Sequence, residues 1–264
     1  MIDTHAHLDF PEFDQDREEV ISRAFDNGVK AIINVGVDLE RSRKSIEIAE
    51  AHENIFATIG FHPHEAGEKN RIPNEGEFQV LADMAKNEKV KAIGEIGLDY
   101  FYYKNSEQVK LQKELFFRQM EIVKESKLPV VIHCRDAWED LYKTISDNKY
   151  SCVNFQLHCY SGEKKDTEKF LKMENVRFSF SGNITYPKPA ERANKLAEAV
   201  QMVPLDKIML DSDAPFLAPQ EFRGKRNEPA YVRHIAEKIA EIKQISGEEV
   251  ERITDENAGE FFEI

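Results

Sequence analysis

The stretch Met1-Ile2-Asp3-Thr4-His5-Ala6-His7 opens the chain, and we predict it to be a β-strand that ends in His-x-His. Residues two positions apart on a strand share a face, so His5 and His7 can aim their imidazoles in one direction. If that face is the inside of a closed barrel, both histidines lie near its mouth. Every later strand can then add a ligand for the same metal ion.

A repeated pattern of strands and helices follows this first strand. Short apolar runs rich in Val, Ile and Phe alternate with longer amphipathic stretches, which is typical of repeated βα units and a parallel sheet. We predict strands at Met1–His7, Ala31–Val37, Ile55–His62, Val90–Leu98, Pro129–Arg135, Cys152–His158, Val176–Gly182 and Lys207–Asp213. We predict helices at Asp16–Asn27, Glu40–Ala51, Glu75–Asn87, Glu107–Ser126, Ala137–Asn148, Glu163–Met173, Pro189–Met202 and Ala230–Ile245, with one more from Gly247 to the end.

The number of units and the chain length both indicate one barrel. A length of 264 residues fits a (β/α)8 barrel, for which about 250 residues is typical. The sequence therefore predicts an α/β protein with a single TIM-barrel domain over residues 1–264 and an extra C-terminal helix. In the sixth predicted strand, Asn154, Gln156 and His158 alternate with apolar residues, which indicates a barrel interior that holds polar groups.

Composition and charge exclude several classes of protein. Hydrophobic residues make up 41% and charged residues 32%, with no apolar run of the ~20 residues that a membrane span needs, so we expect a soluble protein. The formal net charge of −13 argues against a broad basic surface for nucleic acid. A phosphate substrate would have to be held locally. Residue 1 leads directly into a strand and leaves no room for a signal peptide, so we expect a cytoplasmic protein.

Metal-ligand residue types gather at the carboxyl ends of the predicted strands. They are His5, His7, His62, Glu95, His133, His158 and Asp213. In barrels of this kind functional residues collect at that end. A single strand-end histidine is more often a hydrogen-bonded polar residue than a ligand. So many buried polar groups in one place would be unfavourable, however, and metal coordination is the simplest compensation.

The motifs around these residues carry a resemblance to a known family. They are Asp3-Thr4-His5-Ala6-His7-Leu8, Gly60-Phe61-His62-Pro63-His64, Gly94-Glu95-Ile96-Gly97-Leu98-Asp99-Tyr100, His133-Cys134-Arg135, His158-Cys159-Tyr160-Ser161-Gly162, Asp213-Ala214-Pro215 and Arg223-Gly224-Lys225-Arg226-Asn227-Glu228-Pro229. Together, and in this order, they resemble the TatD family of metal-dependent hydrolases, within the amidohydrolase-like barrels. The resemblance runs from residue 1 to the region of Asn257-Ala258.

The resemblance implies a catalytic site with two divalent metal ions. It assigns one ion to His5, His7 and Asp213, the other to His133 and His158, and places Glu95 between them. Two ions about 3.5–4 Å apart can activate a shared water. Asp213 would orient that water and move its proton, and Asp211, on the same strand face, would stand behind it. Imidazoles suit Zn, Mn, Co or Fe, whereas the family is usually described as Mg-dependent, so the native ion stays open.

Other side chains near the predicted mouth are candidates for substrate binding. His62 and His64 flank Pro63 and could contact substrate, His62 also as a catalytic proton donor; the alternative is that they only shape the loop. Arg135 would offer a charged fork to a phosphate, and Ser161 would begin a helix whose backbone N–H groups receive an anion. Arg223 and Arg226 lie in a basic loop that either grips substrate or is simply solvated.

An aromatic run, Phe101-Tyr102-Tyr103, follows the strand of Glu95. Its rings could stack on unpaired bases, or they could be packing residues that close the barrel.

The leading functional hypothesis is a phosphodiesterase on DNA, a 3′–5′ exodeoxyribonuclease that trims single-stranded ends. The resemblance and the local basic groups support it, and we expect DNA as the partner, no membrane and a monomer. The same site would serve ester or amide hydrolysis, so the alternative is a different hydrolase such as a D-aminoacyl-tRNA deacylase. A non-catalytic binding protein would have an incomplete ligand set, whereas every ligand position here carries a competent residue.

Overall fold

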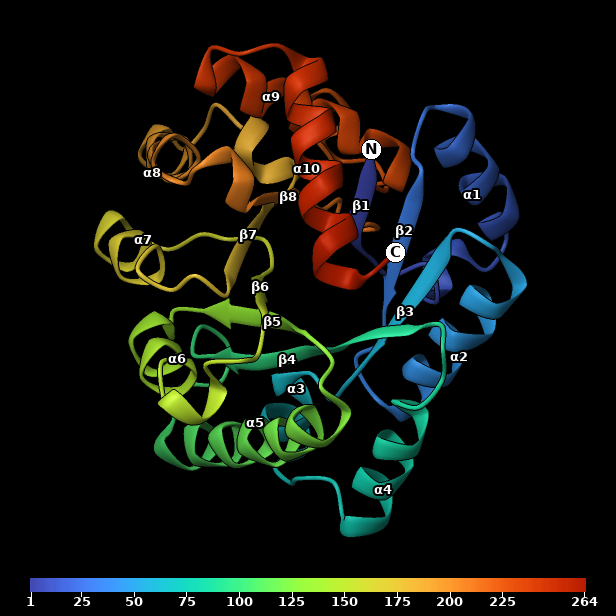
Figure 1. Cartoon of the computed structure of the whole chain (residues 1–264), viewed down its shortest axis with the longest axis vertical. Helices are drawn as coiled ribbons and strands as arrows, with labels where there is room; N and C mark the ends of the chain where they lie inside the picture. Colours follow the sequence, from blue (N-terminus) through green and yellow to red (C-terminus); the bar gives the residue numbers. More distant parts are fainter.

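A ring of eight parallel strands forms the centre of the molecule (Figure 1), as seen in a computed structural model that describes residues 1–264. The strands are β1 (Ile2–Ala6), β2 (Ala31–Val35), β3 (Ile55–Ile59), β4 (Val90–Asp99), β5 (Val130–Arg135), β6 (Phe155–Leu157), β7 (Val176–Phe180) and β8 (Ile208–Leu210). Each strand pairs with the next one in the chain, which confirms the predicted TIM barrel.

The ring is joined between its last and first strands near the mouth. One parallel bridge links Ala6 to Ala214, just beyond the end of β8. The N–H of Asp213 donates to the carbonyl oxygen of His5 at 2.9 Å. This junction places the residues after β8 directly beside the His-x-His end of β1.

Ten α-helices surround the strands. They are α1 (Arg17–Asp26), α2 (Leu39–Ala51), α3 (Pro63–Lys69), α4 (Glu75–Met84), α5 (Ser106–Ser126), α6 (Trp138–Ile145), α7 (Lys164–Phe170), α8 (Ala190–Met202), α9 (Val232–Lys243) and α10 (Gly247–Phe262). Short 3-10 helices occur at Pro11–Phe13, Asn148–Tyr150, Gly182–Thr185, Leu205–Lys207, Gln220–Phe222 and Pro229–Tyr231. None of the helices combines the length and the apolar composition needed to cross a membrane.

Helix α3 was not expected from the sequence. The side chain of His62 caps its start by accepting from the N–H of His64 at 3.2 Å, and Pro63 occupies the first helical position. Proline fits that position because its missing N–H would have no partner inside the helix. The helix therefore begins directly at the end of the third strand and fixes the directions of both histidines.

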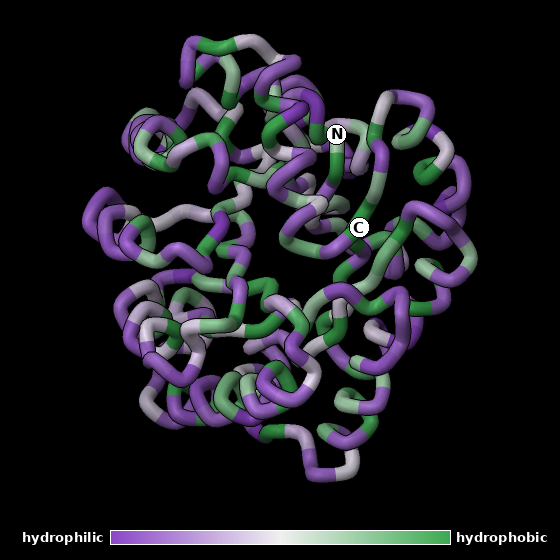
Figure 2. Tube along the Cα trace, in the orientation of Figure 1, coloured by the Kyte–Doolittle hydropathy of each residue, from purple (hydrophilic) through white to green (hydrophobic).

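Burial follows the two-layer arrangement. All five residues of β2 are buried, as expected for a strand with side chains on one face and helices on the other. On α9 the buried residues recur at helical spacing: Val232, Ile235, Ala236, Ile239 and Ala240. In Figure 2 the surrounding helices alternate between hydrophobic and hydrophilic residues along their turns.

Helix α10 closes the amino end of the barrel. The N–H of Ile2, at the start of β1, donates to Asp255 of α10 at 2.7 Å. The apolar side of α10 packs in one cluster with strand residues; this cluster contains Ala258, Phe261 and Phe262 with Ile33, Val35, Ala92, Val131 and Met209. The other end, where the predicted ligands lie, stays open.

The barrel interior is polar above this plug. The Nε2 of Gln156 donates to Thr4 at 2.8 Å and to Ser179 at 2.9 Å, and all three residues are fully buried. The predicted inward direction of Gln156 and His158 is therefore confirmed. It is wrong for Asn154, which precedes β6 and is exposed beside α10.

We expect Gly97→Ala to destabilise the protein strongly. Gly97 lies on β4 with a φ of +146°, and a Cβ there would be 2.0 Å from the carbonyl oxygen of His133 on β5. Strained backbone and overpacking should together lower the free energy of unfolding by about 3 kcal/mol or more. Thermal unfolding measures this, with Gly247→Ala as control because a Cβ there meets nothing within 4 Å. Equal melting temperatures for both variants would contradict the close approach of β4 and β5.

Candidate metal centre and active site

A cavity of about 280 Å³ opens at the carboxyl ends of the strands. Seven of its lining residues are predicted site residues: His7, His62, His64, Glu95, His133, His158 and Asp213. Phe10, Val37 and Phe216 give it one apolar wall. His5 is fully buried at its base, beside Glu95 and His158. The structure therefore brings together all six predicted ligands and both predicted loop histidines.

The two histidines of β1 converge as the sequence pattern suggests. Their Nε2 atoms lie 3.2 Å apart. The Nδ1 of His7 is 3.0 Å from the carbonyl oxygen of Val35, which can only accept a hydrogen bond. Nδ1 therefore carries the proton, and the Nε2 lone pair of His7 faces the cavity. A neutral imidazole in this state is a competent metal ligand.

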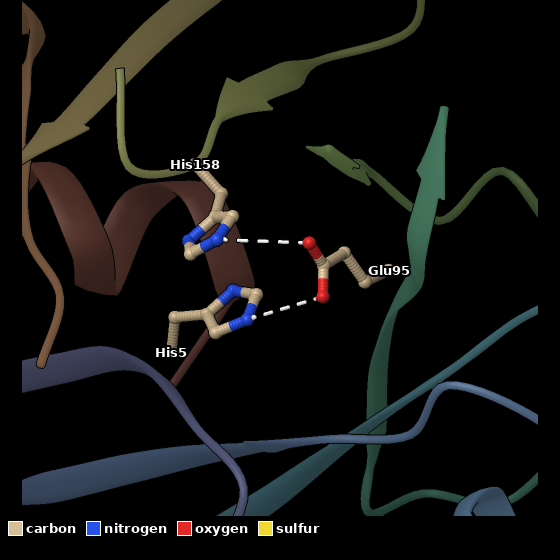
Figure 3. A group of neighbouring side chains, drawn as sticks. All are labelled: His5, Glu95 and His158. Carbon is tan, nitrogen blue, oxygen red and sulfur yellow. Dashed lines mark ion pairs between the residues drawn. The ribbon is translucent and has the colours of Figure 1, made fainter. Parts of the chain in front are cut away.

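Glu95, near the middle of β4, supplies a buried carboxylate whose two oxygens face His5 and His158 (Figure 3). Its Oε2 lies 3.5 Å from the Nε2 of His5 and 3.9 Å from that of His7. Its Oε1 lies 2.7 Å from the Nδ1 of His133 and 3.6 Å from the Nε2 of His158. Its Oε1 is also 3.6 Å from the Nε2 of His62, so the two carboxylate oxygens face different sets of histidines.

Asp211 stands behind His158. Its Oδ2 lies 3.3 Å from the Nδ1 of His158 and accepts from the N–H of Cys159 at 3.0 Å. Ser179 and Ser181 also donate to this carboxylate. The arrangement orients the Nε2 of His158 toward Glu95, as second-layer carboxylates do in metal sites.

Asp213 follows β8 and lines the cavity beside His7 and His158. Its Oδ1 is 3.8 Å from the Nε2 of His7 and 4.0 Å from that of His158. Burial raises the pKa of Asp213 to about 8 in the protein alone, and the neighbouring carboxylates of Asp211 and Glu95 add to the effect. The residue therefore lies within reach of the ligands on β1.

Asp99 is a site residue that the sequence analysis did not single out. It is fully buried at the end of β4, and its Oδ2 lies 3.2 Å from the Nε2 atoms of both His64 and His133. Its Oδ1 accepts from the N–H groups of Phe101 and Tyr102, each at 2.9 Å. Its position four residues after Glu95, in the quoted motif, was the available signal.

The protonation of His62 sets it apart from the other imidazoles. Its Nδ1 accepts from the N–H of His64, so the proton lies on Nε2, 3.6 Å from Oε1 of Glu95. Burial lowers the pKa of His62 to about 4, which keeps the ring neutral. His62 therefore presents an N–H to the cavity where His7 presents a lone pair.

The electrostatics of the protein alone fit a site for cations. Burial raises the pKa of Glu95, but the neighbouring His62, His158 and His5 outweigh it and hold the pKa well below its usual range. Burial lowers the pKa of His133, but hydrogen bonds to Asp99 and Glu95 raise it to about 8. A charged, desolvated carboxylate needs hydrogen-bonded or positive partners, and His133 is such a partner at 2.7 Å.

The ligand atoms of these side chains also lie close enough together to hold divalent metal ions. Three groups of side chains have ligand atoms within 4.8 Å of one another: His5 with Glu95 and His158, His5 with His7 and Asp213, and His62 with Glu95 and His133. Neutral imidazoles with carboxylates suit Zn, Mn, Co or Fe ions. A cation between His133 and Glu95 would take the place of the proton that now links them.

Two of the predicted substrate-binding residues lie outside the catalytic cavity. Arg135 and Ser161 line a second, larger cavity of about 880 Å³ next to β5 and β6. Contrary to prediction, Ser161 does not begin a helix, because α7 starts only at Lys164. The N–H of Glu163, just before α7, donates to the carboxylate of Asp166. Residues 158–162 lie between β6 and α7 and belong to no helix, so the predicted anion site at a helix start with Ser161 is wrong.

The two arginines of the basic loop differ in their surroundings. Arg223 is exposed and stacks on Tyr186, with its Cζ 4.5 Å from the ring centroid. Arg226 binds both carboxylate oxygens of Asp16 at 2.7 Å and one of Glu228 at 3.1 Å, and it lines neither cavity. The hydrogen-bonded Asp16 raises the pKa of Arg226 further. The predicted phosphate grip is therefore contradicted for Arg226, whose guanidinium is already paired.

Comparisons with known proteins agree with this architecture. Residues 2–263 match the family described as TatD related DNase. The chain is 39% identical over 264 residues to the uncharacterized metal-dependent hydrolase YabD of Bacillus subtilis, covering 100% of this chain and 99% of that protein. It is 30% identical over 268 residues to the 3′-5′ ssDNA/RNA exonuclease TatD of Salmonella typhimurium, covering 100% and 99%. The crystal structure of the TatD homolog YjjV from Escherichia coli superimposes with a TM-score of 0.89 at 28% identity, covering 100% of this chain and 98% of that one.

We expect Arg226→Ala to lower stability and leave substrate affinity unchanged. The variant removes the bidentate pair with Asp16, which is partly exposed, so the loss should be about 1 kcal/mol. Thermal unfolding and steady-state kinetics on single-stranded DNA measure the two effects. A raised KM with an unchanged melting temperature would contradict this structural role and show that Arg226 contacts substrate.

Proposed function

The chain belongs to the TatD related DNase family and is a metal-dependent hydrolase, and from this premise we propose that it is a 3′–5′ exonuclease acting on single-stranded DNA ends. The polarity and the strand preference are supported by the relative from Salmonella typhimurium, whose name carries both. The chemistry is supported by the cavity at the carboxyl ends of the strands.

The observation that carries the proposal is the direction of the two oxygens of Glu95. Oε2 faces the histidines of β1, and Oε1 faces His133, His158 and His62, of which His62 presents an N–H and not a lone pair. This division is what a carboxylate bridging two cations requires. We therefore assign His5, His7 and Asp213 to one divalent ion, His133 and His158 to a second, and Glu95 to both.

Such ions, when bound, supply Lewis-acid stabilisation of a phosphoryl oxygen and make water a stronger nucleophile. The side chains of the chain itself then complete the reaction. Asp213 faces the cavity from beside His7 and is placed to orient the attacking water and take its proton. His62 presents its Nε2–H from the other side, where it can donate to a phosphoryl or leaving-group oxygen.

The shape of the cavity favours attack at a chain end. A cavity of about 280 Å³, with Phe10, Val37 and Phe216 among its lining residues, is closer in size to one nucleotide than to a continuous strand. His64, at the rim and partly exposed, can reach a phosphate from the same side as His62. With a net charge of −13, the rest of the surface offers little general attraction for DNA.

We expect divalent ions to stabilise the protein through Glu95. After chelation, adding Mn, Zn, Co or Mg ions singly should raise the melting temperature; at a hundred times Kd the gain is about 2.7 kcal/mol. Glu95→Gln keeps the shape of the side chain but removes the charge, and should lose most of this gain. His52→Gln, at the end of α2, is the matched control. An equal thermal shift in Glu95→Gln would contradict the bridging role.

We expect metal-dependent loss of a 3′ label before a 5′ label from single-stranded DNA. Asp213→Asn should reduce this rate by at least about a hundredfold, the range for loss of a general base. Gel analysis of both labelled strands measures the order of release. Intact DNA under every ion, with release of the amino acid from D-aminoacyl-tRNA, would replace the nuclease with the alternative deacylase on the same site.

A further inference from the structure

We propose that Phe101, Tyr102 and Arg135 form an aromatic platform that binds an unpaired base and its phosphate in the strand leading to the cleaved end. The proposal rests on the proposed function and extends it to a second binding site. Phe101 and Tyr102 follow β4, and Arg135 is the last residue of β5, so the platform lies beside the catalytic cavity.

The platform rings are exposed although their neighbours are packed. Phe101 is 47% and Tyr102 58% exposed. By contrast, Tyr100 donates its hydroxyl to Asp140 at 2.9 Å, and the ring of Tyr103 covers Gly67. The aromatic run therefore divides into two packing residues and two largely exposed residues, Phe101 and Tyr102. One face of Phe101 lies against the guanidinium of Arg135, and a base can stack on the ring surface that stays exposed.

The backbone that carries the two exposed rings is held in place by the buried Asp99. One carboxylate oxygen fixes the N–H groups of Phe101 and Tyr102, while the other contacts His64 and His133. Asp99 is itself anchored, because Gln112 accepts from its N–H at 2.7 Å and donates to its carbonyl oxygen at 3.0 Å. A preorganised platform loses less entropy on binding than a mobile loop.

Arg135 adds a positive charge that no carboxylate neutralises. Its Cζ lies 3.8 Å from the ring centroid of Phe101 and 4.9 Å from that of Tyr102. It forms no ion pair within 4 Å, in contrast to Arg226 with Asp16 and Glu228. A stacked guanidinium keeps its hydrogen-bond donors free for a phosphate.

The platform connects two cavities. The ring of Tyr102 lies 5.5 Å from that of His64, which lines the catalytic cavity. On the other side, Phe101 and Arg135 line the larger cavity, together with Arg192. A strand with its end in the catalytic cavity can therefore continue over Tyr102 toward these arginines.

Most carboxylates that line the larger cavity are paired with lysines, which reduces their repulsion of a phosphate. Glu163 pairs with Lys165 and Lys195, and Glu139 pairs with Lys169. Arg192 has no ion pair, and two carboxylates of the lining, Asp136 and Asp166, have none either. Asp136 is exposed, whereas Asp166 is buried and accepts from the N–H of Glu163 at 3.1 Å. The lining has five basic and five acidic residues, so this region is neutral whereas the whole chain has a net charge of −13.

The test compares Phe101→Ala with the unaltered enzyme on single-stranded oligonucleotides that carry one abasic nucleotide at successive positions from the cleaved end. Loss of one stacked base should lower kcat/KM by on the order of tenfold. We expect one sensitive position in the unaltered enzyme, and no further effect of that abasic nucleotide in Phe101→Ala. Hydrolysis of bis(4-nitrophenyl) phosphate, which lacks bases, should be equal in both.

Phe117→Ala is the matched control, because this ring is 43% exposed but lies on α5 outside both cavities. A binding measurement separates the platform from the proposed function, since Glu95→Gln and Glu95→Gln/Phe101→Ala can be titrated with labelled oligonucleotide without turnover. A higher Kd in the double variant supports base binding by the platform even if no DNA is digested. Equal Kd values and equal abasic profiles would overturn it while leaving the nuclease intact. A change of oligomeric state in Phe101→Ala with unchanged profiles would also overturn it, in favour of a subunit contact.

Discussion

The arrangement of the site depends on one buried carboxylate. Glu95 is almost completely removed from water, yet its surroundings keep it charged. A desolvated negative charge is unfavourable unless positive groups or hydrogen bonds surround it. Here the imidazoles on four other strands or strand ends converge on its two oxygens, and in our proposal two cations complete the compensation. The barrel makes this possible because neighbouring parallel strands end at one face, while α10 fills the other end.

A second layer of acceptors decides what each imidazole can do. The carbonyl oxygen of Val35 and the carboxylate of Asp211 each occupy one ring nitrogen and leave the other directed at Glu95. The start of α3 does the reverse to His62, whose Nδ1 accepts and whose Nε2 therefore carries a proton. Asp99 joins the site to the exposed rings after β4, so residues for chemistry and residues for the proposed strand contact share one support.

Much of the fold could be predicted from the sequence, because barrel strands are short apolar runs and their ends carry recognisable ligand types. The predicted ligands do gather, since the His-x-His pattern and the strand ends fix position without knowledge of side-chain partners. The contacts between side chains that are distant in sequence could not be predicted. Arg226 finds Asp16, which is remote in sequence, and Asp99 is buried by contacts that spacing does not reveal. The helix α3 was missed because it spans only seven residues and depends on a histidine cap.

The most direct test of the account is the electron paramagnetic resonance spectrum of the protein loaded with Mn²⁺, with the bound metal counted in the same sample. A carboxylate shared by two ions holds them close enough for their spins to couple. We expect two ions per chain with a spin-coupled spectrum, and loss of that coupling in Glu95→Gln. A single bound ion, or two ions with no coupling in the unaltered protein, would contradict the bridged centre.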